Sequence, residues 1–178
     1  GVKELILVAQ ETTVYGQDIY GEKSLHRLLR ELCKIDGIQW IRLLYCYPEE
    51  IDANLIQVMK EEPKICHYLD LPIQHASDAI LKKMGRRTSK AQLVDTIRTL
   101  REEIPDITLR TTLITGFPGE TEEQHQELVE FVDEMEFDRL GVFTYSPEEN
   151  TPAAELPDQI PEEVKEDRQA ELMELQQE

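Results

Sequence analysis

Polar and glycine-rich segments follow five apolar runs of this sequence, and these segments hold the residue types that could do chemistry. They are residues 10–13, 46–48, 74–77, 116–120 and 145–148. Apolar runs that end in this way are typical of parallel strands covered on both faces, and ligands bind at the carboxyl ends of such strands. We therefore expect one binding site built from these segments.

The most distinctive segment is residues 116–121, with the sequence Gly-Phe-Pro-Gly-Glu-Thr. Glycines let the backbone approach a ligand closely, and the N-terminus of a following helix offers unpaired N–H groups. The same residues could equally form only a tight turn, because Pro and Gly favour turns. The sequence of this segment leaves both interpretations open.

Three ionisable residues, Arg42, Asp70 and Arg110, stand inside runs that are otherwise apolar. Buried charge is costly unless it is paired or contacts a ligand. They could line a polar cavity, where the Arg110 guanidinium could bind a carboxylate through two hydrogen bonds. Alternatively, an internal Arg–Asp pair could join two strands. Side-chain alternation along the strands favours neither hypothesis.

No complete metal site can be written from the cysteines and histidines. Cys33, Cys46 and Cys66 lie 13 and 20 residues apart, without zinc-type spacing, and are typical of small thiols in a reducing compartment. His75 is a lone histidine before a helix, which favours a structural hydrogen-bonding role over that of a general base. We assign no catalytic residue.

The net charge of −18 is regional. Residues 1–119 are nearly neutral, whereas residues 120–178 hold 20 acidic and 3 basic side chains. A region this acidic repels the phosphate backbone of nucleic acids. We therefore expect no nucleic acid to bind through it and favour a basic partner. A solvated helix surface is the alternative explanation. A basic cluster at residues 82–90 is likewise either a surface for an acidic substrate or RNA, or a solvated helix junction.

Strand and helix patterns alternate along the chain. Apolar runs predict strands at residues 5–9, 39–47, 65–73, 107–115 and 139–145, each followed by helical periodicity. Capping boxes begin at Ser89 and Thr121. This order predicts an α/β protein with parallel strands, as an open sheet or as a barrel. A full barrel of eight units needs about 250 residues, so we exclude it. With no apolar run of about 18 residues, we expect a soluble protein and no membrane partner.

Three segments together resemble the radical S-adenosylmethionine methylthiotransferase family. They are residues 71–77 (Leu-Pro-Ile-Gln-His-Ala-Ser), 81–86 (Leu-Lys-Lys-Met-Gly-Arg) and 113–121 (Leu-Ile-Thr-Gly-Phe-Pro-Gly-Glu-Thr). Within the family, residues 10–16, 145–148 and 156–161 look most like the members that modify an aspartate of a small-subunit ribosomal protein. The resemblance covers essentially the whole chain.

This resemblance implies a partial barrel of six βα units, TIM-like, of which the chain supplies strands two to six and lacks the first unit. Residues 1–156 would form the partial barrel, and residues 157–178 an acidic C-terminal helix of the same domain. Such enzymes bind S-adenosylmethionine over a [4Fe-4S] cluster, cleave it reductively to a 5′-deoxyadenosyl radical and insert a methylthio group.

By position, the resemblance assigns eight residues to S-adenosylmethionine. Gln10 and Glu11 would lie near its amino-acid end, and Arg110 would pair with its carboxylate. The adenine and ribose would contact the remaining five: Ile114, Gly116 and Phe117 for the adenine, and Gln74 and Ser77 for the ribose.

The departures from the family concern the cluster. The Cys-x-x-x-Cys-x-x-Cys motif is absent, and Thr112 stands where a Gly-x-Ile-x-Gly pattern often has its first glycine. The cluster ligands are therefore expected outside this chain, which should be inactive alone. The resemblance also implies a basic ribosomal protein as substrate, a reductant protein and a cytoplasmic location. Two alternatives stay open, a tRNA adenosine methylthiotransferase core and a non-catalytic module that docks basic ribosomal protein.

Overall fold

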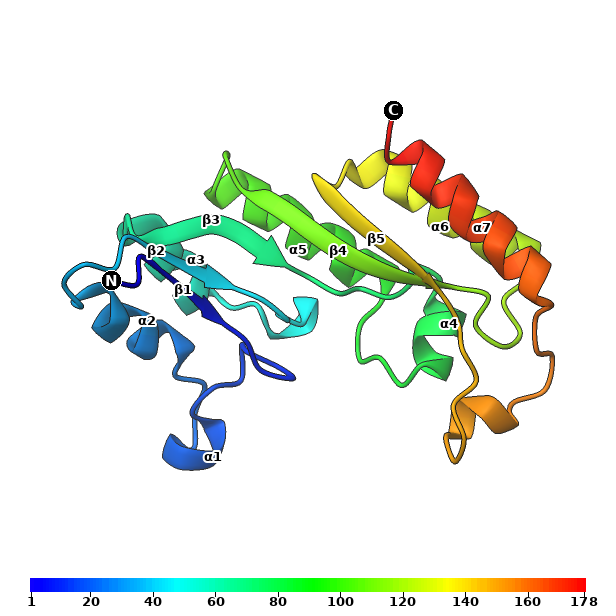
Figure 1. The fold of residues 1–178 in the computed structure, drawn as a ribbon, viewed down its shortest axis with the longest axis horizontal. Coiled ribbons are helices and arrows are strands. Elements are labelled where there is room, and N and C mark those ends of the chain that lie inside the picture. Colours follow the sequence, from blue (N-terminus) through cyan, green and yellow to red (C-terminus); the bar gives the residue numbers. More distant parts are fainter. The chain divides into compact units, whose positions relative to one another are not determined.

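Strands and helices alternate along the chain in a computed structural model that describes all 178 residues (Figure 1). The strands are β1 (Glu4–Leu7), β2 (Trp40–Leu43), β3 (Ile65–Asp70), β4 (Thr108–Thr115) and β5 (Arg139–Thr144). The helices are α1 (Gln17–Tyr20), α2 (Leu25–Cys33), α3 (Ala53–Glu61), α4 (Asp78–Lys83), α5 (Lys90–Glu103), α6 (Glu122–Met135) and α7 (Glu162–Leu175), with short 3-10 turns η1 (Pro48–Glu50) and η2 (Pro152–Glu155).

The strands hydrogen-bond in the order β1-β2-β3-β4-β5. The first four pair in parallel, with Leu5 opposite Ile41 and Leu69 opposite Leu109. Parallel neighbours need a crossover between them, and helices supply these crossovers. The predicted α/β class with parallel strands is confirmed.

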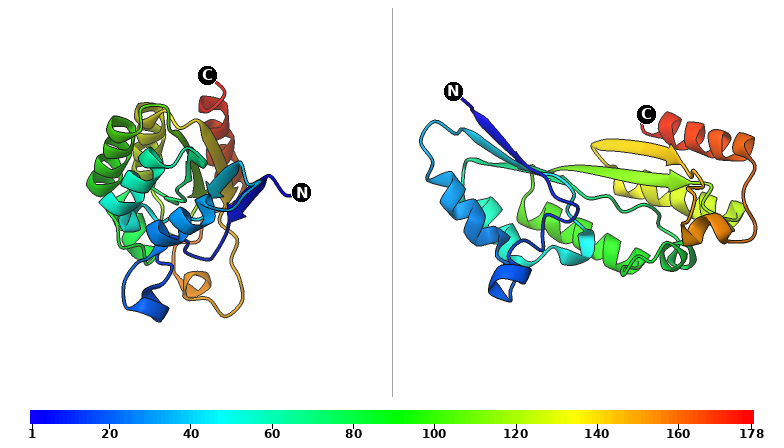
Figure 2. Two further views of the ribbon diagram at one scale, coloured as in Figure 1. Left: turned by 90° about the vertical axis from the view of Figure 1, so that its left-hand side faces the viewer. Right: turned by 60° about the horizontal axis from the view of Figure 1, so that its bottom comes forward.

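The chain divides into two compact units, and β4 and α5 contribute to both. Unit 1 contains residues 1–72 and 95–110, and unit 2 contains residues 73–94 and 111–178. In unit 1, helices α2 and α3 pack side by side against the strands, as both Figure 1 and Figure 2 show. Its core consists of fully buried aliphatic side chains, among them Leu29, Ile41, Leu43, Met59 and Leu69.

In unit 2, α7 packs against β5 and beside α6 (Figure 1). Phe131 and Leu128 of α6 and Leu172 of α7 are completely buried between these elements. The buried face of α7 also contains two charged residues, Lys165 and Arg168. Burying them requires partners, which are described below.

Local capping explains where the longer helices begin. In α6, Gln124 N donates to Thr121 Oγ1 at 3.2 Å, and the Gln124 side chain accepts from Thr121 N at 2.9 Å. Ser89 and Gln92 make the same reciprocal pair at the start of α5. Both capping boxes predicted from the sequence are confirmed. Ser24 stands at the N-cap of α2, but its hydroxyl donates to Glu22 O and caps no backbone N–H of the helix.

Several strands end earlier than the apolar runs predict. Leu71 and Ile73 are buried but follow the end of β3 at Asp70, because Pro72 lacks the N–H that a ladder requires. The chain returns to the sheet at Gln74, which forms an isolated parallel bridge with Leu113. Asp70 and Gln74 therefore do not share one continuous strand. No helix of the structure has the length and apolar character that crossing a membrane requires.

Replacing Thr121 by Ala should lower the free energy of unfolding by about 1 kcal/mol, because Gln124 N loses its acceptor at the start of α6. Urea unfolding monitored by circular dichroism measures this change. Glu130→Ala, on an exposed position of the same helix, is the control and should be nearly neutral. Equal midpoints for Thr121→Ala and the unaltered chain would contradict the role of the cap.

Candidate functional site

In unit 1, the carboxylate of Glu11 lies just beyond β1 and is held by backbone donors. Its Oε1 accepts from Thr13 N at 2.9 Å and from the Thr13 hydroxyl, and its Oε2 accepts from Tyr47 N at 3.1 Å. Burial is the largest effect on this group and raises the pKa of Glu11 despite these hydrogen bonds. A cation placed next to Glu11 would therefore be favoured.

Asp70, at the end of β3, is also buried and only partly satisfied. Its Oδ2 accepts from Tyr45 N at 3.1 Å, whereas its buried Oδ1 has no hydrogen-bond partner. The nearest cationic atom is Arg110 Nη1 at 4.0 Å, and the Arg110 side chain is 44% exposed. The structure thus places a long Asp70–Arg110 ion pair in unit 1 and leaves a carboxylate oxygen and a guanidinium with spare hydrogen-bonding capacity.

The third ionisable strand residue, Arg42, has a structural partner. Its Nε donates to Glu4 Oε1 at 2.7 Å, and its guanidinium lies 4.8 Å from the centre of the Tyr68 ring. The hydrogen bond that Arg42 donates to Glu4 is the largest effect on the Arg42 guanidinium and raises its pKa. Arg42 therefore joins β2 to β1 and β3, with Glu4 and not an aspartate as its ionic partner.

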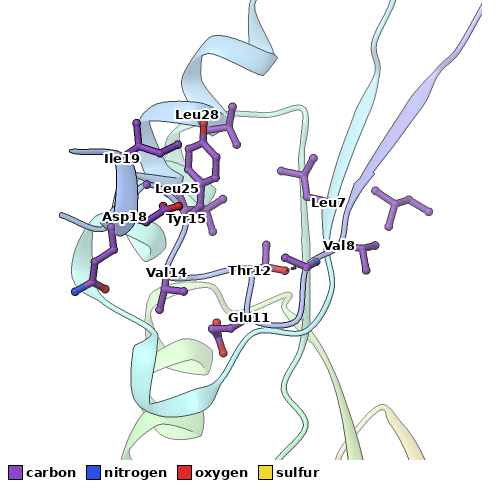
Figure 3. Close-up of a pocket in the computed structure, with 14 residues that line it drawn as sticks. Leu7, Val8, Glu11, Thr12, Val14, Tyr15, Asp18, Ile19, Leu25 and Leu28 are labelled. Carbon is purple, nitrogen blue, oxygen red and sulfur yellow. Dashed lines mark hydrogen bonds between the residues drawn. The ribbon is translucent and has the colours of Figure 1, made fainter. Parts of the chain in front are cut away.

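A pocket of about 870 Å³ lies beside β1 in unit 1 (Figure 3). Leu7 and Val8 line one side of the pocket, and Tyr15, Ile19 and Leu28 line the other. Among the residues assigned to the cofactor from the sequence, Glu11 alone lines this pocket. Its mostly apolar walls suit contact with apolar groups more than the binding of a charged amino-acid moiety.

In unit 2, Gln74 is joined to β4 by backbone hydrogen bonds on both sides. Gln74 N donates to Thr112 O, and Ile114 N donates to Gln74 O, both at 2.9 Å. Gln74 has φ +72°, a backbone conformation that is uncommon outside glycine. The buried Oε1 of Gln74 has no hydrogen-bond partner. An unpaired buried acceptor of this kind is costly unless a ligand supplies a donor.

Next to Gln74 in sequence, His75 forms a fully buried pair with Glu120. His75 Nε2 and Glu120 Oε2 are 2.7 Å apart, and both side chains have no solvent exposure. His75 Nδ1 accepts from Ser77 N at 3.0 Å. Glu120 Oε1 accepts from Gly116 N at 3.0 Å and from Arg168 Nη1 at 2.7 Å. The structure thus gives His75 the structural role that the sequence favoured.

Several partners keep Glu120 ionised inside unit 2. Burial, the largest single effect, acts to raise the pKa of Glu120. The hydrogen bonds from His75 and Gly116 and the charge of Arg168 together outweigh burial and hold this pKa below its usual value of 4.5.

Gly116 is required by its position as well as by its conformation. It has φ +70°, and a Cβ atom built on it would fall 2.2 Å from Cγ of Lys165. The Lys165 stem fills this space because its Nζ donates to Tyr145 O at 2.8 Å. Next to it, Phe117 packs edge-on against Tyr145, with ring centres 5.3 Å apart, and Ile114 packs against the cluster that these rings form with Ile80. The buried Tyr145 hydroxyl has no hydrogen-bond partner.

The predicted cofactor residues thus fall into two groups, one in each unit. In unit 1, hydrogen bonds and the long ion pair connect Glu11 to Arg110 through residues 45–47 and Asp70, whereas Gln10 is exposed and its side chain makes no hydrogen bond in this structure. In unit 2, backbone contacts and packing bring together Gln74, Ser77, Ile114, Gly116 and Phe117.

Sequence reasoning missed the partners that support these groups. Arg168 and Lys165 were not considered, because charged residues in an acidic helix are usually solvated. Their spacing of three residues was the available signal, since it places both on one side of α7.

No group of three or more His, Cys, Asp or Glu side chains in the structure could hold a metal ion. Cys46 is fully buried, and burial raises the pKa of its thiol, so it is a poor thiolate ligand. Cys33 and Cys66 are partly buried, and burial raises their pKa values too. The residues of this chain do not fit an iron–sulfur cluster.

The family model described as "Radical SAM superfamily" matches residues 1–132. The chain is 70% identical over 177 residues to the ribosomal protein uS12 methylthiotransferase RimO of Lachnoclostridium phytofermentans, and 59% identical over 176 residues to that of Geobacter sulfurreducens. These alignments cover 99% of this chain but only 40% and 39% of the relatives, so the chain spans about two fifths of their length.

Two solved structures share the fold. The archaeal Elp3 of Methanocaldococcus infernus aligns with a TM-score of 0.61 at 14% identity, covering 97% of this chain and 44% of that one. The radical S-adenosylmethionine methyltransferase TsrM of Kitasatospora setae aligns with a TM-score of 0.59 at 19% identity, covering 79% and 27%. At these identities the likeness concerns the fold alone, and it confirms the predicted partial barrel.

Gly116→Ala should destabilise the protein by about 1–3 kcal/mol, because the new methyl group overlaps the Lys165 stem at a left-handed backbone position. Thermal and urea unfolding measure the change. Gly141→Ala in β5 is the matched control, because its added Cβ meets only Phe143 at 3.8 Å and its φ is not positive. A Gly116→Ala protein as stable as Gly141→Ala would contradict the close approach of Lys165.

The ionised Glu120 should make stability depend on pH in a defined direction. Because its folded pKa is lowered, its contribution is complete above the usual value of 4.5 and is lost as the pH falls through the folded pKa. Urea midpoints from about pH 7 to about pH 3 should therefore show a stability difference between the unaltered protein and Glu120→Gln that shrinks towards acid. A stability difference between the two proteins that grows as the pH falls would contradict a lowered pKa for Glu120.

Proposed function

This chain belongs to the radical SAM superfamily, and on that premise we propose that it is the S-adenosylmethionine-binding core of a methylthiotransferase acting on an aspartate of ribosomal protein uS12. The identity to RimO proteins over nearly the whole chain is the observation that carries this proposal. The activity would belong to the complete protein, because the chain corresponds to only part of those relatives.

The unpaired polar atoms of unit 1 fit the amino-acid end of S-adenosylmethionine. Its ammonium group would contact the Glu11 carboxylate, with the free Oδ1 of Asp70 as a further acceptor. Its carboxylate would pair with Arg110, whose side chain is 44% exposed. Arginine binds carboxylates through two parallel hydrogen bonds, so this pair would also fix orientation. Gln10, exposed beside Glu11, would complete this group.

The residues of unit 2 fit an adenosine group. The free Oε1 of Gln74 would accept from a ribose hydroxyl, and Ser77 lies three residues further along the same turn. Ile114, Gly116 and Phe117 offer apolar surface and close backbone approach for the adenine ring. In this proposal the chain binds and orients the cofactor and excludes water, whereas the cofactor supplies the chemistry.

The cofactor pair would consist of S-adenosylmethionine and a [4Fe-4S] cluster with ligands outside this chain. Bound together and reduced, they supply the radical chemistry that functionalises an unactivated carbon. A reductant protein would be needed as electron donor. No step is assigned to a residue of this chain as acid, base or nucleophile.

The acidic region of residues 120–178 supports a basic protein substrate. Of its three basic side chains, Lys165 and Arg168 are buried, so Arg139 alone is exposed among 20 acidic residues. Such a surface attracts a basic ribosomal protein and repels nucleic acid. Modification of a ribosomal protein further supports a cytoplasmic location. We also propose that residues 1–156 and the acidic helix 157–178 belong to one domain.

The complete protein, reconstituted with iron and sulfide and then reduced, should release 5′-deoxyadenosine from S-adenosylmethionine. In a deletion strain, mass spectrometry should show that uS12 loses the mass of a methylthio group while tRNA is unchanged. Loss of the group from tRNA instead would identify the tRNA-modifying relative. If the reconstituted protein releases no 5′-deoxyadenosine, the chain is a docking module rather than part of an enzyme.

Arg110→Met in the complete protein should raise the dissociation constant for S-adenosylmethionine about tenfold to a hundredfold, because a charge-assisted hydrogen bond to the carboxylate is lost. Equilibrium dialysis with labelled S-adenosylmethionine measures this. Arg42→Met is the matched control, since that arginine also lies in a strand but pairs with Glu4. Equal dissociation constants for the two variants would remove Arg110 from the binding site.

A further inference from the structure

A buried network joins two turns of unit 2, at Ser77 and at Gly116, to helix α7. It consists of His75, Glu120 and Arg168, whose side chains are at most 9% exposed. Glu120 stands between the other two, 2.7 Å from His75 Nε2 and 2.7 Å from Arg168 Nη1. None of these three residues is among those proposed to contact S-adenosylmethionine.

The hydrogen bonds define the direction of donation through the network. His75 Nδ1 accepts from Ser77 N, so in the neutral ring the hydrogen lies on Nε2 and is donated to Glu120 Oε2. Glu120 Oε1 accepts from both Gly116 N and Arg168 Nη1. Both carboxylate oxygens are therefore occupied within the protein. Glu120 is not free to contact a ligand, so any effect it has on a ligand must act through its neighbours.

Each end of the network holds the backbone of a turn that carries a proposed cofactor residue. At one end, the His75 ring fixes the backbone N–H of Ser77. At the other end, the Glu120 carboxylate fixes the backbone N–H of Gly116, which precedes Phe117. Because the two turns are 39 residues apart at Ser77 and Gly116, no local chain geometry sets their spacing. The His75–Glu120 hydrogen bond is the direct side-chain link between them.

Helix α7 completes the network from outside the region that the family model matches. Arg168 also donates to Glu120 O at 3.2 Å and to Glu122 Oε2 at 3.2 Å, so its guanidinium binds the turn and the start of α6 together. Without this cation, Glu120 would be a buried carboxylate lacking its charge partner. Residues 162–175 thus lie beyond residues 1–132 of the family match and still support the turn at Gly116.

We propose that His75, Glu120 and Arg168 are positioning residues for S-adenosylmethionine, which set the spacing of the Ser77 and Gly116 turns and make cofactor affinity depend on α7. This inference rests on the proposed function, because it takes these two turns as the adenosine site. Preorganised turns bind a ligand without a further ordering cost, so loosening them raises the dissociation constant.

The test uses the complete protein and measures the dissociation constant for S-adenosylmethionine. Glu120→Gln places an amide where every neighbour of the carboxylate is a donor, so one contact becomes donor against donor. We expect this variant to raise the dissociation constant about tenfold, the effect of roughly one hydrogen bond. The KM for S-adenosylmethionine should rise in parallel, while kcat at saturation stays within about twofold.

Glu171→Gln is the matched control. His125 Nε2 and Glu171 Oε2 form a second His–Glu pair at 2.7 Å between α6 and α7, but this pair touches neither turn. Glu171→Gln should therefore lower thermal stability while leaving the dissociation constant for S-adenosylmethionine unchanged. An equal rise in the dissociation constant for Glu120→Gln and Glu171→Gln would show that the network acts only through general stability. That result would overturn the proposal.

Two further measurements decide the matter if Glu120→Gln does not fold. Arg168→Lys keeps the positive charge but cannot bind Glu120 and Glu122 together, so it should raise the dissociation constant less than tenfold but measurably. In the unaltered protein, S-adenosylmethionine should slow amide exchange in residues 74–77, in residues 116–120 and in α7. The proposal is overturned if S-adenosylmethionine leaves amide exchange in α7 unchanged, or if Arg168→Lys has the dissociation constant of the unaltered protein. If the unaltered protein does not bind S-adenosylmethionine at all, the proposed function fails instead.

Discussion

The ionised side chain of Glu120 is buried in unit 2 without solvent exposure and constrains the elements around it. Isolation of a carboxylate from water costs several kcal/mol unless hydrogen bonds and an opposite charge replace its hydration. The chain meets this requirement with three donors from different places: the His75 ring, the Gly116 amide and the Arg168 guanidinium. One electrostatic requirement therefore joins two turns and a helix that are far apart in sequence.

The carboxylates of unit 1 are less completely paired, and this contrast distinguishes a supporting group, Glu120, from the proposed binding groups Asp70 and Glu11. Asp70 keeps one buried oxygen without a hydrogen bond, and its closest cation is 4.0 Å away. Glu11 is held by amides and a hydroxyl but by no cation, and its pKa is raised. Glu120, by contrast, is fully satisfied and has a lowered pKa. A cofactor with an ammonium group would supply the hydrogen bonds and the positive charge that the Asp70 and Glu11 carboxylates lack.

The elements that depend on local patterns were predictable from the sequence. Helix α2 follows its spacing of leucines, and α5 and α6 begin at their capping boxes. The end of β3 and the left-handed Gln74 were not predictable, since Pro72 interrupts the ladder inside an apolar run. The buried face of α7 was missed for a different reason. Hydropathy treats Lys165 and Arg168 as solvent-facing, whereas tertiary partners decide their burial.

The close approach of Lys165 to Gly116 links two positions that are 49 residues apart in the chain. The lysine stem occupies the volume that any side chain at position 116 would need, and its amino group is anchored on Tyr145 O. A shorter residue at position 165 would open that volume and expose the glycine backbone. The two positions should therefore be coupled during evolution, because a short side chain at position 165 removes the steric barrier at position 116 and leaves the left-handed backbone as the reason to keep glycine.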